Sequence, residues 1–269
     1  MIDVAEATRA NDVAQQVEAL YGDPLTHPAG VLHVTSVWER PTAAGDGTDL
    51  VTLRIDEHAP PSRHDFFVLN LCRARADAIV VSGKILRDEP EVRHTLQGPA
   101  ELPEALAAWR REQLSKSAPP ISAVLTSGRG LDLDHPLFAS AHRPTLFTTP
   151  DGWRALEEAA TQRGIGAVTD PAMTLRKAID YLQSQGARTI SIECGPRTSA
   201  GLYDAPVAVD ELLLSVFEGE LPSRSQGAVL RRRDELEELL ERQGPGARRR
   251  SESGPWRFER FLRLTELPA

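Results

Sequence analysis

Cysteine is almost absent from this sequence of 269 residues, in which only Cys72 and Cys194 occur. Two cysteines are too few for a disulfide-stabilised scaffold, so we expect both thiols to be reduced. No apolar run approaches the ~20 residues that cross a bilayer. Residues 1–6 also lack the basic and apolar regions of a signal peptide. These absences favour a cytoplasmic protein that does not act at a membrane.

Positive charge is also scarce, since the formal net charge is −8 and the sequence pI is about 5.5. An acidic chain is a poor candidate for a general nucleic-acid binder, because duplex affinity depends on basic surface. An anionic small-molecule substrate needs only a local basic pocket and is not excluded. The length is ample for a sizeable hydrophobic core, and a hydrophobic content of 41% agrees with a globular chain.

Several motifs of common enzymes are missing. The sequence has neither the G-x-S-x-G elbow of hydrolases nor the phosphate-binding G-x-x-x-x-G-K-[ST] loop. A G-x-G-x-x-G fingerprint is absent too, which disfavours a standard Rossmann domain. The seven histidines form no H-x-x-x-H or H-E-x-x-H pair, so we expect no metal site.

Short apolar strands alternate with amphipathic helices over most of the chain, a pattern typical of an α/β fold with a largely parallel sheet. The expected strands cover residues 32–38, 51–55, 78–81, 121–125, 144–147, 166–168, 189–192 and 209–217. The expected helices cover residues 5–20, 64–75, 101–114, 153–162, 173–185 and 198–203, and Ser62 is the predicted N-cap of the second.

The last 40 residues have a different pattern. A charged amphipathic helix is expected over 230–241 and a flexible basic loop over 244–251. Residues 256–264 alternate apolar with charged side chains, as a half-buried strand does. We therefore expect a single domain over 1–269, with a charged helical and loop insertion at about 223–253 that returns a last antiparallel strand to the sheet.

Three strand exits carry small, hydroxyl and basic residues. The carboxyl ends of parallel strands meet at one edge of a sheet, where ligands of such folds bind. Pro196 also suits a first helical turn, whose N–H groups attract anions. Each exit alone is best explained as a solvated turn, but together they suit a molecule with several phosphates, such as a dinucleotide. The three exits are Ser82-Gly83-Lys84, Thr126-Ser127-Gly128-Arg129 and Cys194-Gly195-Pro196-Arg197-Thr198.

Longer motifs resemble a known family. Residues 72–81 and 86–90 are similar to the pattern L-R-A-R-A-D-A-I-L-V followed by R-A-D-D-P, and 192–196 and 209–212 to V-E-G-G-P followed by V-D-E-L. Residues 123–127 and 134–138 resemble the family's middle strand and loop. Together, from about Val31 to Phe217, the chain resembles the reductase domain of bacterial riboflavin biosynthesis, the RibD C-terminal family.

This resemblance implies a three-layer α/β/α fold of the dihydrofolate-reductase type, with a mostly parallel central sheet and an antiparallel C-terminal edge strand. It also implies an NADPH-dependent reductase that is usually a homodimer. The family's small-molecule substrate is a 5-phosphoribosylamino-pyrimidine, in which hydride reaches the ribose C1 of the ring-opened imine. Such a reaction depends mainly on holding the nicotinamide and the substrate phosphate in place.

The resemblance also implies site residues by motif position. Ser36 and Asp88 would be catalytic, and Arg73 and Arg93 would hold the substrate, although a helix-surface ion pair is an alternative for Arg73. Thr126, Ser127 and Arg129 would lie near the adenosine 2′-phosphate. The full set of expected cofactor-binding residues is Ser82, Gly83, Lys84, Thr126, Ser127, Arg129, Glu193, Gly195, Pro196, Arg197 and Thr198.

The sequence departs from the family at its active edge. The family's S-L-D-G, which ends the first strand, is here Ser36-Val37-Trp38-Glu39, and its G-A-G-T is here Ser82-Gly83-Lys84-Ile85. A divergent, non-catalytic protein that binds a nucleotide or mediates dimeric interactions is therefore an alternative. An unrelated α/β transferase of a phosphorylated small molecule is a third. A Trp38 side chain that closed the cleft would count against the reductase.

Overall fold

The computed structural model describes residues 8–55, 57–99, 101–139 and 143–264. The N-terminal residues 1–6, on which the signal-peptide argument rests, lie outside these ranges. The described strands are β1(Gly30–Pro41), β2(Thr48–Leu53), β3(Ala78–Ser82), β4(Ile121–Leu125), β5(Thr145–Thr148), β6(Ala167–Thr169), β7(Thr189–Glu193), β8(Glu211–Phe217), β9(Gln226–Arg232), β10(Leu240–Ser251) and β11(Gly254–Arg263). The α-helices are α1(Ala10–Tyr21), α2(Arg63–Arg75), α3(Gly83–Asp88), α4(Leu102–Leu114), α5(Pro150–Arg154), α6(Glu157–Gln162), α7(Leu175–Ser184), α8(Pro196–Ser199) and α9(Arg233–Leu239).

The described strands form one sheet in the order β10-β11-β8-β1-β7-β3-β4-β5-β6, and β2 joins β1 to β9. The run from β8 to β6 is parallel throughout. The pairs β8–β11, β10–β11, β1–β2 and β2–β9 are antiparallel. The predicted mostly parallel sheet with an antiparallel C-terminal edge is confirmed, and that edge is a hairpin in which β10 is the outermost strand.

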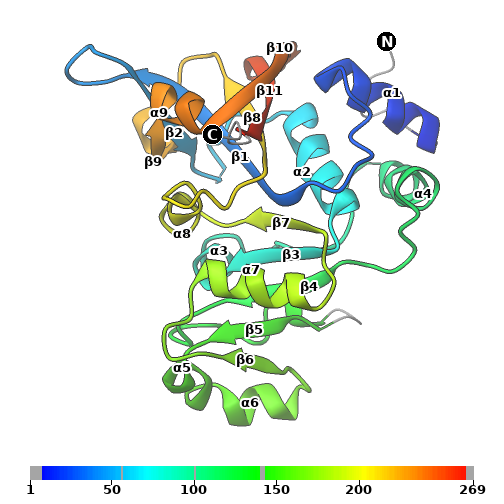
Figure 1. The fold of residues 1–269 in the computed structure, drawn as a ribbon, viewed down its shortest axis with the longest axis vertical. Helices are drawn as coiled ribbons and strands as arrows, with labels where there is room; N and C mark the ends of the chain where they lie inside the picture. The colour runs from blue at the N-terminus through cyan, green and yellow to red at the C-terminus, as the bar shows by residue number, and fades with distance from the viewer. Residues whose placement is uncertain (1–7, 56, 100, 140–142, 265–269) are drawn as a thin grey trace, which may run out of the picture.

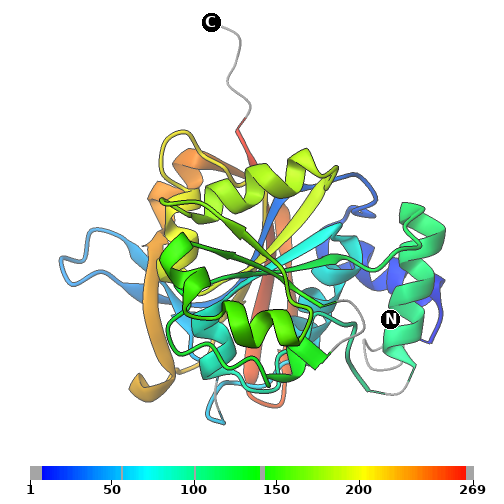
Figure 2. The same cartoon turned by 90° about the horizontal axis from the view of Figure 1, so that it is seen from below.

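Helices cover both faces of this twisted sheet (Figures 1 and 2). On one face α1, α2 and α4 pack through side chains such as Phe67 and Trp109, both fully buried. On the other face Ile179 and Leu182 of α7 pack on Ile190 of β7. The neighbouring β3 residues Val80 and Val81 belong to core clusters on opposite faces, as the two-residue period of a strand requires. The α/β/α layering of the dihydrofolate-reductase-like fold is therefore confirmed.

Local signals in the sequence set most element ends correctly. Ser62 caps α2 as predicted, because its hydroxyl accepts a hydrogen bond from the Asp65 amide at 3.2 Å. The helix expected over 153–162 is instead broken into α5 and α6. None of the helices in the described part of the chain has the length and apolar character that a bilayer crossing requires.

The C-terminal insertion is more strand-like than its charge pattern suggests. The helix expected over 230–241 is confined to α9, because the residues before it pair with β2 as β9. The loop expected over 244–251 belongs to β10, which pairs with β11. Ladder hydrogen bonds on both sides of α9 override the local helical period.

A buried ion pair joins α2 to the sheet. The Arg75 guanidinium, 2% exposed, donates from Nη2 to Oε2 of Glu211 in β8 at 2.8 Å. The other Glu211 oxygen accepts from Nε of Arg260 in β11 at 2.6 Å. Three elements far apart in the sequence therefore meet at one carboxylate.

We predict that Glu211→Gln destabilises the protein by about 3 kcal/mol, because it leaves the Arg75 charge buried without a counter-charge. Urea unfolding followed by circular dichroism measures this change in the free energy of unfolding. The matched control is Asp151→Asn, which removes an exposed partner of Arg154 and should leave the unfolding midpoint unchanged. An unchanged midpoint for Glu211→Gln would show that the pair does not stabilise the fold.

Candidate functional site

A cavity of about 280 Å³ lies at the carboxyl ends of β3 and β4. We call it the carboxyl-edge cavity. In Figure 1 these strands point to one side of the sheet, where α3, α5 and α8 begin. Six predicted cofactor residues line it: Ser82, Gly83, Lys84, Thr126, Ser127 and Thr198. Arg87, Leu125, Thr149 and Met173 complete the lining.

The backbone around this cavity is held by hydroxyl groups that cap turns and helices. Ser82 accepts from the Ile85 amide at 3.4 Å at the start of α3, and Thr149 accepts from the Gly152 amide at 3.1 Å at the start of α5. Thr126 accepts from the Gly128 amide at 3.0 Å. These caps stabilise the local backbone at the exits of β3, β4 and β5.

Gly83 permits a close approach between two of these exits. A Cβ atom at this position would lie 2.9 Å from the Thr126 hydroxyl oxygen and 3.2 Å from its Cβ. Such a contact is shorter than normal packing allows. The glycine in the family-like turn therefore permits the close spacing of the β3 and β4 exits.

Two cationic side chains border the cavity. Lys84 is 60% exposed and forms an ion pair with Asp88 one turn further along α3. Arg87 also lines the cavity and donates from Nη1 to the Arg129 carbonyl at 3.3 Å. Cations, hydroxyls and helix starts together suit a phosphorylated ligand.

The remaining expected cofactor residues do not line the cavity. Gly195 is the N-cap of α8 and Pro196 its first residue, as the turn predicted. Arg197 and Arg129 are exposed. Glu193 ends β7 and makes a different contact.

Arg73 and Glu193 contact each other. Nη2 of Arg73 lies 2.7 Å from Oε2 of Glu193, and Nε lies 3.0 Å from Oε1. The two side chains are 2% and 7% exposed, and Nη1 of Arg73 donates to the Thr95 carbonyl at 3.3 Å. The alternative ion pair for Arg73 therefore exists, but it is buried and joins α2 to β7 rather than lying on the helix surface.

The expected catalytic residues lie apart. The Ser36 hydroxyl donates to Oδ1 of Asp65 at 2.7 Å, whereas Asp88 is exposed at the end of α3 and pairs with Lys84. Burial raises the pKa of Asp65, and the Ser36 hydroxyl opposes this shift. Arg93 is exposed and does not line the carboxyl-edge cavity. Six of the expected cofactor residues therefore line one cavity, whereas none of the expected substrate and catalytic residues lines it.

The two residues that replace the family's Asp-Gly have structural partners. The Trp38 indole is half-buried, packs against the core cluster of α1, α2 and α4, and donates to the Gly219 carbonyl at 3.1 Å. Trp38 is not among the residues that line the carboxyl-edge cavity. It therefore does not close that cavity.

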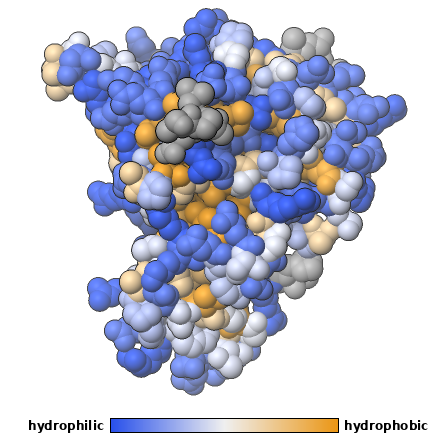
Figure 3. Space-filling view, in the orientation of Figure 1, coloured by the Kyte–Doolittle hydropathy of each residue, from blue (hydrophilic) through white to orange (hydrophobic). Residues whose placement is uncertain are grey.

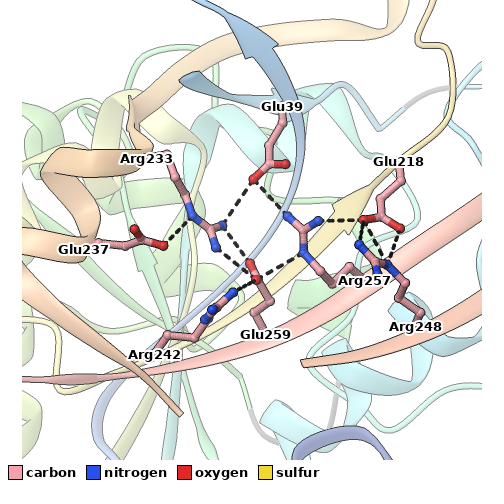
Figure 4. A network of polar contacts seen from close by, with 8 residues as sticks. All are labelled: Glu39, Glu218, Arg233, Glu237, Arg242, Arg248, Arg257 and Glu259. Carbon is pink, nitrogen blue, oxygen red and sulfur yellow. Dashed lines mark hydrogen bonds and ion pairs between the residues drawn. The ribbon is translucent and has the colours of Figure 1, made fainter. Parts of the chain in front are cut away.

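Glu39 belongs to a charged network with the C-terminal hairpin (Figure 4). Its Oε1 lies 2.9 Å from Nη2 of Arg257 and 3.3 Å from Nη1 of Arg233. Both arginines also contact Glu259, which is fully buried, and Arg233 does so through two bonds of 2.7 and 2.9 Å. Burial would raise the pKa of Glu259, but Arg233 and Arg257 hold it below the ordinary value.

Sequence reasoning missed three residues near the site. Thr149 follows the fifth strand before Pro150, a pattern that signals a helix cap at a strand exit. Arg87 lies three residues after Lys84, on the same side of α3. Glu89 has no local signal, because its burial beside Glu193 arises only from the fold. Among the described residues, no cluster of histidine, cysteine and carboxylate side chains could hold a metal ion.

Comparisons with known proteins identify the family and the fold of this chain. Residues 45–218 match the family model of the RibD C-terminal domain. The structure is similar to a pyrimidine reductase-like protein from Corynebacterium diphtheriae, with 21% identity, a TM-score of 0.66, and coverage of 93% of this chain and 99% of that chain. The sequence matches none of the curated proteins.

Two longer proteins also share the fold. RibD from Acinetobacter baumannii is 13% identical with a TM-score of 0.60, over 90% of this chain and 59% of that chain. The diaminohydroxyphosphoribosylaminopyrimidine deaminase/5-amino-6-(5-phosphoribosylamino)uracil reductase of Thermotoga maritima is 10% identical with a TM-score of 0.52, over 87% and 56%. This chain therefore spans less than two thirds of either protein, and the likeness concerns the fold.

The Glu89 carboxyl should make stability depend on pH. Burial and the charge of Glu193 raise its pKa to about 7, from 4.5. The folded state therefore binds the proton more tightly than the unfolded state, and this contribution to stability is lost as the pH rises from 4.5 to 7. We predict that the wild type loses about 2 kcal/mol relative to Glu89→Gln between pH 5 and pH 7.

Urea unfolding of both proteins at several pH values in this range measures the difference. Glu91→Gln, at an exposed neighbouring position, is the control and should follow the wild type. A constant difference between wild type and Glu89→Gln across the range would contradict the predicted protonation.

Proposed function

Since the chain belongs to the RibD C-terminal domain family, we propose that it is an NADPH-dependent reductase of a phosphoribosylamino-pyrimidine, in or near riboflavin biosynthesis. The reaction type is that of 5-amino-6-(5-phosphoribosylamino)uracil reductase. The observation that carries the proposal is the carboxyl-edge cavity, where six expected cofactor residues from three separate strand exits meet.

The residues of this cavity fit the phosphates of a dinucleotide. Its volume of about 280 Å³ is close to the lower end, roughly 300 Å³, of small-molecule sites. Gly83 lets the β3 exit pack closely against Thr126, and the lining offers hydroxyl, ammonium and guanidinium groups as donors. In this proposal Ser82, Lys84, Arg87 and Thr198 hold the phosphates, and Thr126, Ser127 and Arg129 lie near the 2′-phosphate.

NADPH would supply the hydride, and the protein would hold the imine carbon of the substrate beside it. Arg93, which is exposed, would meet the substrate phosphate. Arg73 would act as a positioning residue, because its guanidinium is already bound by Glu193. Ser36 would move a proton through Asp65, to which its hydroxyl is bonded, while Asp88 would orient Lys84. The expected homodimer and cytoplasmic location are parts of the same proposal.

A non-catalytic nucleotide-binding member of the family is the second candidate. The specific observation in its favour is that Glu39 and Trp38, at the family's Asp-Gly position, contact the C-terminal hairpin and the Gly219 carbonyl. The two candidates differ in one result. A reductase oxidises NADPH when the phosphoribosylamino-pyrimidine is added, whereas a binding protein retains NADPH affinity without turnover.

We predict saturable NADPH binding that is tighter than NADH binding. Fluorescence titration of the purified protein with both nucleotides measures the two affinities. The 2′-phosphate of NADPH gives the basic residues at the cavity an additional charge to bind. If neither NADPH nor NADH binds at millimolar concentration, the reductase proposal is excluded.

We further predict that Arg87→Ala weakens NADPH binding about tenfold, a loss of about 1.4 kcal/mol, because one charge-assisted contact is removed. The control is Arg154→Ala, at an arginine that is 74% exposed on α5 and does not line the cavity. Equal NADPH affinity in wild type and Arg87→Ala would remove Arg87 from the cofactor site.

A further inference from the structure

A second cavity, of about 390 Å³, lies at the opposite end of the strands. It is bounded by α4, by the segment that leads into β4 and by residues after α3, and we call it the amino-edge cavity. In Figure 1 this region, beside α2 and α4, lies across the sheet from α3 and α8. The carboxyl-edge cavity shares none of its lining residues. A ligand here would therefore not occupy the proposed cofactor site.

The lining of the amino-edge cavity is strongly basic. Arg73, Arg110, Arg111 and Lys116 line it, with Glu104 as the acidic member. Glu193 balances the charge of Arg73, and Asp77 balances that of Lys116 at 2.7 Å. The remaining charged residues of the lining are two arginines, Arg110 and Arg111, and one carboxylate, Glu104. The lining therefore has an excess of positive charge.

Arg110 is buried without a carboxylate partner in the described part of the chain. Its Nη1 donates to the carbonyls of Ala74 and Ala76, and its Nη2 to that of Ala118, each at 2.6 Å. Its Nε has no hydrogen-bond partner among the described residues. Three carbonyl oxygens fix this guanidinium in place, and the nearby Asp77 carboxylate, which also pairs with Lys116, offsets only part of its charge, which favours a further anion nearby.

His94 adds a second polar group at the same cavity. One ring nitrogen, Nδ1, lies 2.6 Å from the Ser122 hydroxyl, and Nε2 is buried with no partner within the described ranges. Burial lowers the pKa of His94 to about 4, so the ring is neutral at physiological pH. A neutral ring can offer a hydrogen bond without adding charge.

The other walls are apolar. Leu96, Pro103, Ala107, Pro119 and Pro120 face the cavity. Apolar walls with a few polar groups at defined points are typical of small-molecule sites, and a volume near 400 Å³ is within their usual range of roughly 300–1,000 Å³. Proline rings also lose little conformational entropy when a flat ligand packs on them.

We propose that the amino-edge cavity is a second ligand site, which binds a small phosphate monoester or carboxylate attached to a flat apolar group. The anion lies against Arg110 and Arg111, and the apolar group packs on the proline and alanine wall. Arg73 connects this site to β7 through Glu193, so an occupant contacts a residue that the family motif places beside the substrate.

The test uses phenyl phosphate as the probe, with phenol as its uncharged counterpart, in calorimetric titrations of the full chain. Phenyl phosphate should bind the wild type with one site and phenol should bind at least about tenfold more weakly. Arg111→Glu should weaken phenyl phosphate binding at least about tenfold, because it reverses a charge at the cavity mouth. Arg111 is exposed, so this substitution leaves the core intact.

Arg224→Glu is the matched control, because it makes the same charge change at an exposed residue of the 3₁₀ turn Ser223–Ser225, away from both cavities. It should bind phenyl phosphate as the wild type does. NADPH titration of Arg111→Glu should also give the wild-type affinity. Equal phenyl phosphate affinity in wild type and Arg111→Glu, equal affinity for phenol, or no binding at millimolar probe would each overturn the proposal.

Discussion

Two buried arginines at the end of α2 hold the fold in register. Arg73 is bound by Glu193 at the end of β7, and Arg75 by Glu211 at the start of β8. Neither arginine can lose its partner without leaving a charge in the core, at a cost of several kcal/mol. Because β7 and β8 flank β1, the two ion pairs fix α2 against the central strands from both sides. Arg73 also lines the amino-edge cavity, so one of the two ion pairs forms part of its wall.

Much of this organisation follows from the sequence, because strand exits and helix caps are local signals. Ser82 and Thr126 lie at the carboxyl edge because each directly follows a buried strand. The ion pair between Arg73 and Glu193 could not be predicted from local signals. The two residues are 120 positions apart, and only the tertiary fold brings them together. In the C-terminal insertion, a local signal gave a wrong prediction. There the charge pattern predicts a helix over 230–241, but pairing with β2 before it and with β11 after it shortens the helix to Arg233–Leu239.

The surface in Figure 3 is largely hydrophilic on the face viewed, and the apolar residues gather toward its centre. The charged network of Figure 4 joins the C-terminal hairpin to β1 through Glu39 and Glu259. The Trp38-Glu39 departure from the family pattern is thus linked to the arginines of this hairpin. Glu39 thus pairs with basic residues of the C-terminal segment, and neither Trp38 nor Glu39 lines the carboxyl-edge cavity.

Strand β1 pairs with three other strands of the sheet, β7, β8 and β2. It is parallel to β7 over Gly30–His33 and to β8 over Leu32–Trp38, and antiparallel to β2 over Val37–Pro41. A slip by one residue would turn Ser36 away from Asp65 and Glu39 away from Arg233 at the same time, because side chains alternate between faces. Misregistered forms would thus lose polar contacts on both faces at once. Two chemically different contacts, that of Ser36 with Asp65 and that of Glu39 with Arg233, therefore both favour the correct register of β1.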